Sequence, residues 1–328
     1  MQVAITGATG LVGSNLAQAC LERGWTVRAT RRRSSRAAHL AHLDIQWVDA
    51  DLSDEESLRA AFSGCNAVFH CAAAVSILRA APAWMVDANV GGTERVLRAL
   101  PSDARLVHCS STVAVGLSLD GKPVDEEGAW NFADFGLEDG YARTKRRAEE
   151  RVTAAVAKAG IDAVIVNPGF MFGPYDIKPS SGKMICDVVK GTVPAYSSGW
   201  NNFVNVRDVV QGMLLAWEHG GRGERYILGN ENLPYKQAFE RIAAVAGAKA
   251  PRIPVPLWLA LPVGWAGDLQ YALTKKEPLL TSNALRWGYC DRFIFSSDKA
   301  RRELGYAPTP IEDGIALALD WYRQEGWP

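Results

Sequence analysis

The feature that restricts the fold most strongly is an alternation, over the first two thirds of the chain, of short apolar runs with longer amphipathic segments. Short runs rich in Val, Ile and Ala, separated by segments of helix length, are typical of βαβ units and a parallel sheet. The pattern predicts strands at 3–6, 26–30, 45–48, 67–70, 106–109 and 163–167, and helices at 11–23, 54–63, 83–100 and 141–159.

Three helix boundaries in this pattern carry local signals. Gly24 and Gly160 follow the first and the last of these helices, where a left-handed residue after the helix end favours glycine. Ser53, with Glu56 three residues later, predicts a capping box at the start of the second helix. Local chemistry therefore supports the boundaries that the hydrophobic periodicity indicates.

Beyond Pro168 the sequence becomes less regular, because prolines are spread among glycine and aromatic residues. Seven of the eleven tryptophans lie beyond residue 190. Such large amphipathic side chains suit packing around an organic ligand, although filling the core of a small domain explains any one of them equally well. This part of the chain is therefore expected to form a smaller lobe of mixed structure.

Charge and cysteine content argue against several classes of function. Lys plus Arg and Asp plus Glu both total 36, so the formal net charge is zero, and we expect no nucleic-acid partner. The cysteines show no CxxC pair and no histidine at metal-ligand spacing, which predicts neither a disulfide framework nor a metal site. We expect free thiols in a reducing cytoplasm. The cysteines are Cys20, Cys65, Cys71, Cys109, Cys186 and Cys290.

Neither end of the sequence nor its interior indicates a membrane segment. The N-terminal sequence MQVAITGATG has no basic region and no small-residue cleavage site, so no secretory signal is predicted. The most apolar stretch, 253–266, is interrupted by prolines and is shorter than the roughly 20 residues that span a bilayer. We interpret it as a buried or interfacial segment and expect no membrane contact.

A glycine-rich bend directly follows the first predicted strand and opens the first predicted helix. Glycines at such a bend allow a tight turn and a close approach of the backbone to a pyrophosphate, whose charge is met by the N-terminal end of the helix. The bend therefore predicts a dinucleotide-binding site. Its predicted cofactor contacts are Gly7, Gly10, Leu11, Val12 and Gly13.

The end of the second predicted strand indicates which dinucleotide is bound. An acidic residue that binds the ribose hydroxyls of NAD is expected about 20 residues after the glycines. The sequence there is TRRRSSR, with no carboxylate to repel a 2′-phosphate. Arg31 and Arg32 are the predicted ligands of that phosphate, which favours NADP(H) and leaves NAD(H) as the alternative.

Tyr141 and Lys145 lie four residues apart and share one face of a predicted helix. A phenol becomes a useful acid or base near neutral pH when a nearby cation stabilises its ionised form. Ser110 and Ser111 follow the strand predicted at 106–109, and open α/β sheets bind ligands beyond the carboxyl ends of their strands. These hydroxyl and amino groups therefore predict a proton-transfer site.

Taken together, these motifs resemble those of the extended short-chain dehydrogenase/reductases, the epimerase/dehydratase superfamily. The resemblance is carried by TGATGLVG at the start, Ser110-Ser111 followed by Gly116, the Tyr141 to Lys145 motif, and Asn167-Pro168 with Phe172-Gly173-Pro174 after it. TVRATRRR is similar to the NADP-binding turn of dihydroflavonol reductases. The segments from Val166 and from Gly223 resemble hopanoid-associated sugar epimerases. The similarity spans roughly 1–245.

The resemblance implies a role for each matching residue. Tyr141 would be the general acid/base, Ser111 would bond the substrate carbonyl, and Lys145 would bind the nicotinamide ribose and lower the Tyr141 pKa. Ser111 is chosen over Ser110 because it lies five residues before Gly116. Asn89 would lie behind the site, and a homodimer would form through the helix that carries Tyr141 and its neighbour. Further cofactor contacts would come from Asp51, Leu52, Cys71, Ala72, Ala73 and Pro168.

Two departures from the family pattern bear on the substrate. Many nucleotide-sugar enzymes of this superfamily read the diphosphate with an arginine before an FxHVxD motif, but this chain has Asn201-Asn202 at that place. Asn167 also replaces the arginine of the usual Arg-Pro motif. Because an amide cannot replace a charged bidentate fork, nucleotide-sugar recognition is in doubt while the redox chemistry is not.

The resulting expectation is a doubly wound α/β Rossmann fold with a smaller C-terminal substrate-binding lobe. A dinucleotide-binding domain is expected over 1–170, with the chain returning to it near 203–229, and most of 171–328 is assigned to the lobe. The expected function is NADPH-dependent reduction of a small-molecule ketone or aldehyde, reversible as alcohol oxidation. The alternatives are a sugar or nucleotide-sugar epimerase/dehydratase and a redox-sensing binding protein without catalysis.

Overall fold

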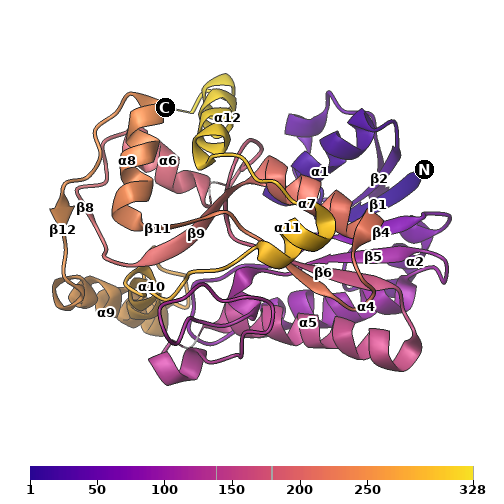
Figure 1. The fold of residues 1–328 in the computed structure, drawn as a ribbon, viewed down its shortest axis with the longest axis horizontal. Coiled ribbons are helices and arrows are strands. Elements are labelled where there is room, and N and C mark those ends of the chain that lie inside the picture. Colours follow the sequence, from indigo (N-terminus) through magenta and orange to yellow (C-terminus); the bar gives the residue numbers. More distant parts are fainter. Residues whose placement is uncertain (138, 179, 328) are drawn as a thin grey trace.

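The computed structural model describes residues 1–137, 139–178 and 180–327. Its main layer is a parallel sheet in which β1 lies between β2 and β4 (Figure 1). The strand order is β10-β6-β5-β4-β1-β2-β3, so the sheet is doubly wound, as predicted. The strands are β1 (Gln2–Thr6), β2 (Thr26–Arg31), β3 (Ile45–Asp49), β4 (Ala67–His70), β5 (Arg105–Cys109), β6 (Ala163–Pro168) and β10 (Arg225–Leu228).

Helices cover both faces of this sheet, which explains why β4 and β6 are buried along their whole length. Successive residues of β1 serve different cores: Val3 and Ile5 pack with Leu16 of α1, while Ala4 packs with Leu58 of α2. The first face is covered by α1 (Leu11–Glu22) and α7 (Val206–His219), and the second by α2 (Glu55–Phe62), α4 (Gly92–Ala99) and α5 (Gly140–Ala159).

The predicted helix boundaries are confirmed at two places and wrong at one. Gly24 and Gly160 have φ angles of +72° and +68° after α1 and α5, as the glycine signal indicated. The capping box at Ser53 is wrong. Asp54 caps α2 instead, because its carboxylate lies directly before the helix and accepts hydrogen bonds from the N–H groups of Glu56 and Ser57. Ser53 donates to Asp51.

The predicted helix over 83–100 is interrupted by a π-helical turn. It consists of α3 (Ala83–Val86), the turn Asp87–Gly91 and α4. Turns of this kind are often found at functional sites. Here the turn carries Asn89, whose side chain is buried.

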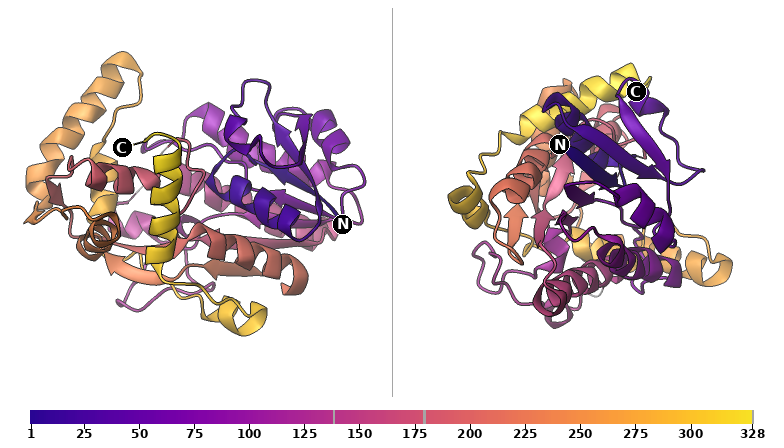
Figure 2. Two further views of the ribbon diagram at one scale, coloured as in Figure 1. Left: turned by 90° about the horizontal axis from the view of Figure 1, so that it is seen from above. Right: turned by 90° about the vertical axis from the view of Figure 1, so that its right-hand side faces the viewer.

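Most of the rest of the chain forms a second lobe beyond the carboxyl ends of the strands, where the chain continues from β6 and β10 (Figures 1 and 2). Its strands are β7 (Phe170–Phe172), β9 (Trp200–Asn205) and β11 (Glu231–Pro234), which form one small sheet, and the paired β8 (Ala195–Tyr196) and β12 (Ile253–Pro254). Its helices are α6 (Gly182–Val189), α8 (Tyr235–Ala246), α9 (Leu257–Thr274), α10 (Ser282–Gly288), α11 (Asp298–Leu304) and α12 (Ile311–Gln324).

One expectation about this part of the chain needs correction. The apolar stretch over 253–266 is not buried, because it forms most of α9, a helix that continues through Pro262; the interfacial alternative stays open. The tryptophans are dispersed: Trp287 stacks on Phe293 with ring centroids 4.8 Å apart, Trp217 meets Trp25, and Trp258 is largely exposed. In the part of the chain that the structure describes, no helix has the length and apolar character needed to cross a bilayer.

Candidate active site

The glycine bend between β1 and α1 is closely packed at two of its three glycines. Gly7 has a φ angle of +73°, and a Cβ there would lie 2.6 Å from the Ala72 nitrogen. A Cβ on Gly13 would lie 2.7 Å from the Ala8 Cα. Gly10 differs, because a Cβ there would meet only the Gly7 carbonyl oxygen, at 3.5 Å. The fold itself therefore requires Gly7 and Gly13, while the Gly10 backbone is open to a ligand.

The start of α1 fits the pyrophosphate of a dinucleotide. Gly10 is the N-cap, no side chain caps the helix, and its first turn, which includes Leu11 and Val12, contains no acidic residue. The positive end of the helix dipole and unused N–H groups thus face the bend. The loop with Cys71, Ala72 and Ala73 lies alongside, since the Cys71 N–H donates to the Thr6 carbonyl oxygen at 3.1 Å. These residues fit the cofactor that the sequence predicts.

The arginine-rich turn at the end of β2 has an acidic neighbour that sequence reasoning missed. Asp49 lies opposite Arg31 in the β2–β3 register and contacts both Arg31 and Arg33 at 3.5 Å. The expectation that no carboxylate is present is therefore wrong: Asp49 comes from the neighbouring strand, which a local reading of the turn cannot show. Arg31 also lies over the Trp47 ring, with its guanidinium 5.3 Å from the ring centroid. Arg32 is exposed.

Asp51 and Leu52 follow β3 on the same side of the site. Hydrogen bonds from Ser53 lower the pKa of the Asp51 carboxyl, and the charge of Arg32 contributes in the same direction. Leu52 packs against Gly92, where a Cβ would lie 3.1 Å from the Leu52 Cβ. Asp51 therefore stays ionised beside the arginine turn, and Leu52 connects this segment to α4 through its contact with Gly92.

The sequence motif on α5 is built around a buried lysine. Lys145 is 3% exposed, and its Nζ donates a hydrogen bond of 2.7 Å to the carbonyl oxygen of Cys109 at the end of β5. Burial lowers the pKa of Lys145. Asp139 caps the helix by accepting a hydrogen bond of 2.8 Å from the Ala142 N–H. The cap and the lysine together hold the first turns of α5 against the strand end.

Tyr141 lies one helical turn before Lys145, and its side chain is partly exposed. Burial of the phenol raises the pKa of Tyr141, and the neighbouring Cys109 and Asp139 add to this effect. The expected lowering of the Tyr141 pKa by Lys145 is not found in this structure. Desolvation is the largest cause of the rise in the pKa, and the Lys145 ammonium group bonds the Cys109 carbonyl oxygen.

The two serines after β5 have different partners. The Ser110 hydroxyl donates to the Glu149 carboxylate at 2.8 Å. Ser111 instead caps the short turn Thr112–Ala114, because its Oγ accepts a long hydrogen bond of 3.4 Å from the Val113 N–H. Ser110 thus has a structural partner, and the hydroxyl of Ser111 is the less strongly engaged of the two. This difference agrees with the choice of Ser111.

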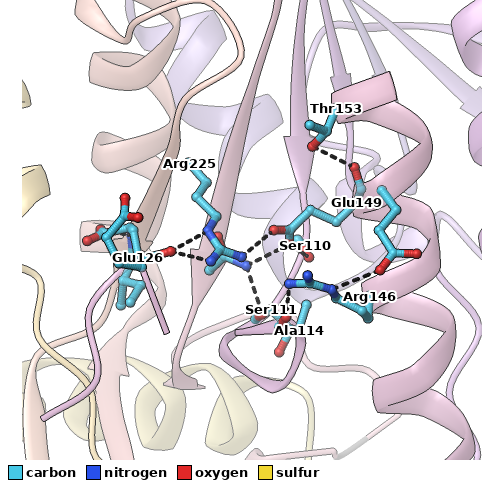
Figure 3. A network of polar contacts seen from close by, with 12 residues as sticks. Ser110, Ser111, Ala114, Glu126, Arg146, Glu149, Thr153 and Arg225 are labelled. Carbon is cyan, nitrogen blue, oxygen red and sulfur yellow. Dashed lines mark hydrogen bonds and ion pairs between the residues drawn. The ribbon is translucent and has the colours of Figure 1, made fainter. Parts of the chain in front are cut away.

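Behind Ser111 lies a buried polar network that sequence reasoning also missed (Figure 3). Glu149 accepts hydrogen bonds from Ser110, from the Asn167 amide at 2.9 Å and from Arg225 at 2.9 Å. Asn167 also donates to the Ser111 carbonyl oxygen at 2.9 Å. The network joins α5, β5, β6 and β10. The sequence feature that indicates this network is Glu149, which lies four residues after Lys145 on the same buried face of the helix. A buried carboxylate requires a cation as its partner.

Two further predicted residues lie at the edges of this arrangement. Pro168 is the last residue of β6, directly after Asn167. Asn89 donates to the Thr144 hydroxyl of α5 at 2.9 Å and exchanges hydrogen bonds with the backbone of Ala74. The π-helical turn thereby ties the loop after β4 to the helix that carries Tyr141.

The glycine bend and the α5 motif at the carboxyl edge of a doubly wound sheet define an NAD(P)-dependent oxidoreductase of the extended short-chain type. A model of the NAD-dependent epimerase/dehydratase family matches residues 3–229, and the chain belongs to that family.

Three relatives match almost the whole chain. A putative dihydroflavonol 4-reductase of Synechocystis sp. is 35% identical, covering 98% of this chain and 95% of that protein. The sterol demethylase protein B of Methylococcus capsulatus is 34% identical, covering 99% of both chains. A 4-hydroxy-2-methyl-3-oxo-4-farnesyl-3,4-dihydroquinoline-1-oxide ketoreductase of Stigmatella aurantiaca is 33% identical, covering 99% of this chain and 97% of that one. Among solved structures, the crystal structure of gox2253 is 36% identical and has a TM-score of 0.85. The match covers 99% of this chain and 98% of that chain.

The buried ion pair between Arg225 and Glu149 leads to a stability prediction. Arg225→Met leaves the Glu149 carboxylate buried without its cation, so we expect a loss of about 3–5 kcal/mol in the free energy of unfolding. Arg151→Met, which removes an exposed ion pair from the same helix, is the control and should cost less than about 1 kcal/mol. Urea unfolding measures both. Adding Glu149→Gln to Arg225→Met should recover part of the loss, and equal losses in the two single variants would contradict this account.

Asp139 leads to a prediction about pH. Burial raises the pKa of Asp139 from 3.8 to about 6, so the folded protein binds this proton more tightly than the unfolded chain. Its contribution to stability is fully present below pH 3.8 and is lost as the pH rises through about 6. Between about pH 7 and pH 4, wild type should gain about 2–3 kcal/mol relative to Asp139→Asn. Parallel stability curves for the two proteins, measured by urea unfolding, would show that Asp139 has an ordinary pKa.

Proposed function

We propose that this protein is an NADPH-dependent reductase of a ketone or aldehyde. The observation that supports this most directly is the arrangement at the end of β5, where buried Lys145 holds α5 against the strand that leads to Ser111. The motif carrying Tyr141 is thereby fixed at the carboxyl edge of the sheet, beside the predicted dinucleotide site. When bound, the reduced nicotinamide supplies a hydride.

The chain's own residues supply the proton and the orientation of the carbonyl. Because burial raises the Tyr141 pKa, its hydroxyl stays protonated near neutral pH and can donate to the carbonyl oxygen as negative charge develops there. Ser111 would hold the same oxygen with a second hydrogen bond, a fixed donor of the kind that stabilises such charge. Lys145 would hold the nicotinamide ribose.

The substrate we propose is an apolar carbonyl compound without a diphosphate. Asn201, which occupies the position of the diphosphate-binding arginine, donates to the Tyr235 hydroxyl at 3.1 Å. Asn202 bonds Asn232 at 2.8 Å. Both amides form hydrogen bonds within the second lobe, and neither carries the positive charge that would bind a diphosphate. The relatives named a dihydroflavonol reductase and a farnesyl dihydroquinoline ketoreductase support the same substrate class.

The reductase is tested against the epimerase/dehydratase alternative by its consumption of NADPH. We expect one alcohol formed and one NADPH oxidised per turnover with a panel of aromatic and isoprenoid ketones and aldehydes. An epimerase or dehydratase reoxidises and rereduces a retained cofactor, so product formed without a net loss of reduced-nicotinamide absorbance would overturn the proposal.

Removal of the proposed proton donor should affect turnover and not cofactor binding. Tyr141→Phe is expected to lower kcat by about 100- to 10,000-fold, the range typical of acid/base catalysis. The Kd for NADPH, measured by titration, should stay unchanged. Tyr271→Phe, on α9, is the control and should keep wild-type turnover. A Tyr141→Phe variant that works at the wild-type rate would exclude this role.

The cofactor preference is tested at Arg32. Arg32→Ala should weaken NADPH binding by about 10- to 100-fold, because it removes a charged hydrogen-bond donor from the 2′-phosphate. NADH binding should be unaffected. Arg36→Ala removes another exposed arginine of the same turn and is the control. Equal losses of NADPH and NADH affinity in Arg32→Ala would mean that the arginine does not read the phosphate.

A further inference from the structure

Helix α9 packs against the protein with its glycines and presents its large side chains to the outside. A Cβ on Gly264 would lie 2.6 Å from the Ser282 Cα of α10, and one on Gly267 would overlap the Leu280 carbonyl. Gly264 is the buried residue of the helix. Figure 2 shows α9 along the outer edge of the molecule, away from the large sheet. This arrangement reverses the usual one, in which a surface helix buries its large apolar residues.

The outward face of α9 is an apolar strip in which Gln270 is the one exposed amide. At about 100° per residue, its exposed residues occupy roughly 160° of the helix, and at about 1.5 Å per residue they extend over roughly 22 Å. Asp268 is the one charged residue of the helix, and its carboxylate accepts a hydrogen bond from the Ser282 N–H, on the side facing α10. We call this strip the α9 face: Trp258, Leu259, Val263, Trp265, Leu269 and Leu273, each more than half exposed.

Exposed basic residues flank the α9 face in the sequence. Lys249 and Arg252 precede β12 and the helix, and Lys275 and Lys276 directly follow the helix. The next residue, Glu277, directs its carboxylate to the body of the protein, where it accepts hydrogen bonds of 2.7 Å from the Ser76 hydroxyl and the Ile77 N–H. An apolar strip that ends in a pair of lysines is complementary to apolar material edged by negative charge.

This charge pattern distinguishes two occupants of the α9 face. A second copy of the chain, packed on it in the parallel direction, would place Lys275 and Lys276 against the same two lysines. An anionic lipid surface instead offers acyl chains to the strip and negative headgroups to its flanks, and tryptophan suits the boundary between them. We propose that the α9 face docks this protein on an anionic lipid bilayer. This revises the expectation of no membrane contact.

The test is co-flotation of the full-length protein with vesicles of phosphatidylcholine alone or mixed with phosphatidylglycerol. Wild type should float with the mixed vesicles, and less so with neutral ones or in high salt. Lys275→Gln with Lys276→Gln should weaken binding to the mixed vesicles by about five-fold for each charge removed and leave binding to neutral vesicles unchanged. Trp258→Ser with Trp265→Ser should lower binding to both kinds of vesicle by at least about ten-fold.

The matched control is Trp84→Ser, because Trp84 of α3 and Trp265 are both 55% exposed. It should float like wild type. Since every substituted side chain is exposed, thermal unfolding should be unchanged, which separates lost docking from misfolding.

The proposal is overturned if wild type stays unbound to the mixed vesicles, or if the Trp84 variant loses as much binding as the α9 variants. An oligomer that the α9 substitutions dissociate, without vesicle binding, would also overturn it by identifying a second copy as the occupant. The assay contains no substrate or cofactor, so its outcome is independent of the reductase proposal.

Discussion

A buried ammonium group that needs a partner is the constraint on which the active site depends. Lys145 is almost fully removed from water, and its Nζ hydrogen bond goes to the Cys109 carbonyl at the end of β5. A buried charge without such a bond would cost several kcal/mol, so α5 is held at one position relative to the strand. This bond therefore also fixes where Tyr141, one turn earlier on α5, and Ser111, two residues beyond Cys109, lie relative to each other.

The polar network behind Ser111 extends the same principle to the edge of the sheet. Glu149, one turn after Lys145, is neutralised by Arg225 of the edge strand β10. Arg225 also donates to the Glu126 carbonyl oxygen at 2.7 Å, in the loop that follows Ser111. The network behind the site is thus complete only with β10 in the sheet. This explains why a strand distant in sequence from the Tyr141 motif is needed to complete its surroundings.

The sequence was sufficient to predict the elements whose structure depends on local chemistry. The apolar alternation, the glycine bend and the glycines after α1 and α5 depend on nearby residues, and these elements are as expected. What could not be predicted depends on pairing between distant segments. Asp49 meets Arg31 only through the register of two strands, and the burial that raises the pKa of Tyr141 depends on the packing around it. The exposure of α9 likewise follows from its glycines facing α10, which hydropathy along the chain does not show.

The measurement that tests the account most directly is a crystal structure of the protein with NADP+ bound. The account predicts the pyrophosphate at the start of α1 over Gly10, the 2′-phosphate at Arg32, and the Tyr141 hydroxyl directed at the nicotinamide. Cofactor bound elsewhere with the glycine bend empty, or a Tyr141 hydroxyl turned away from the ring, would contradict it.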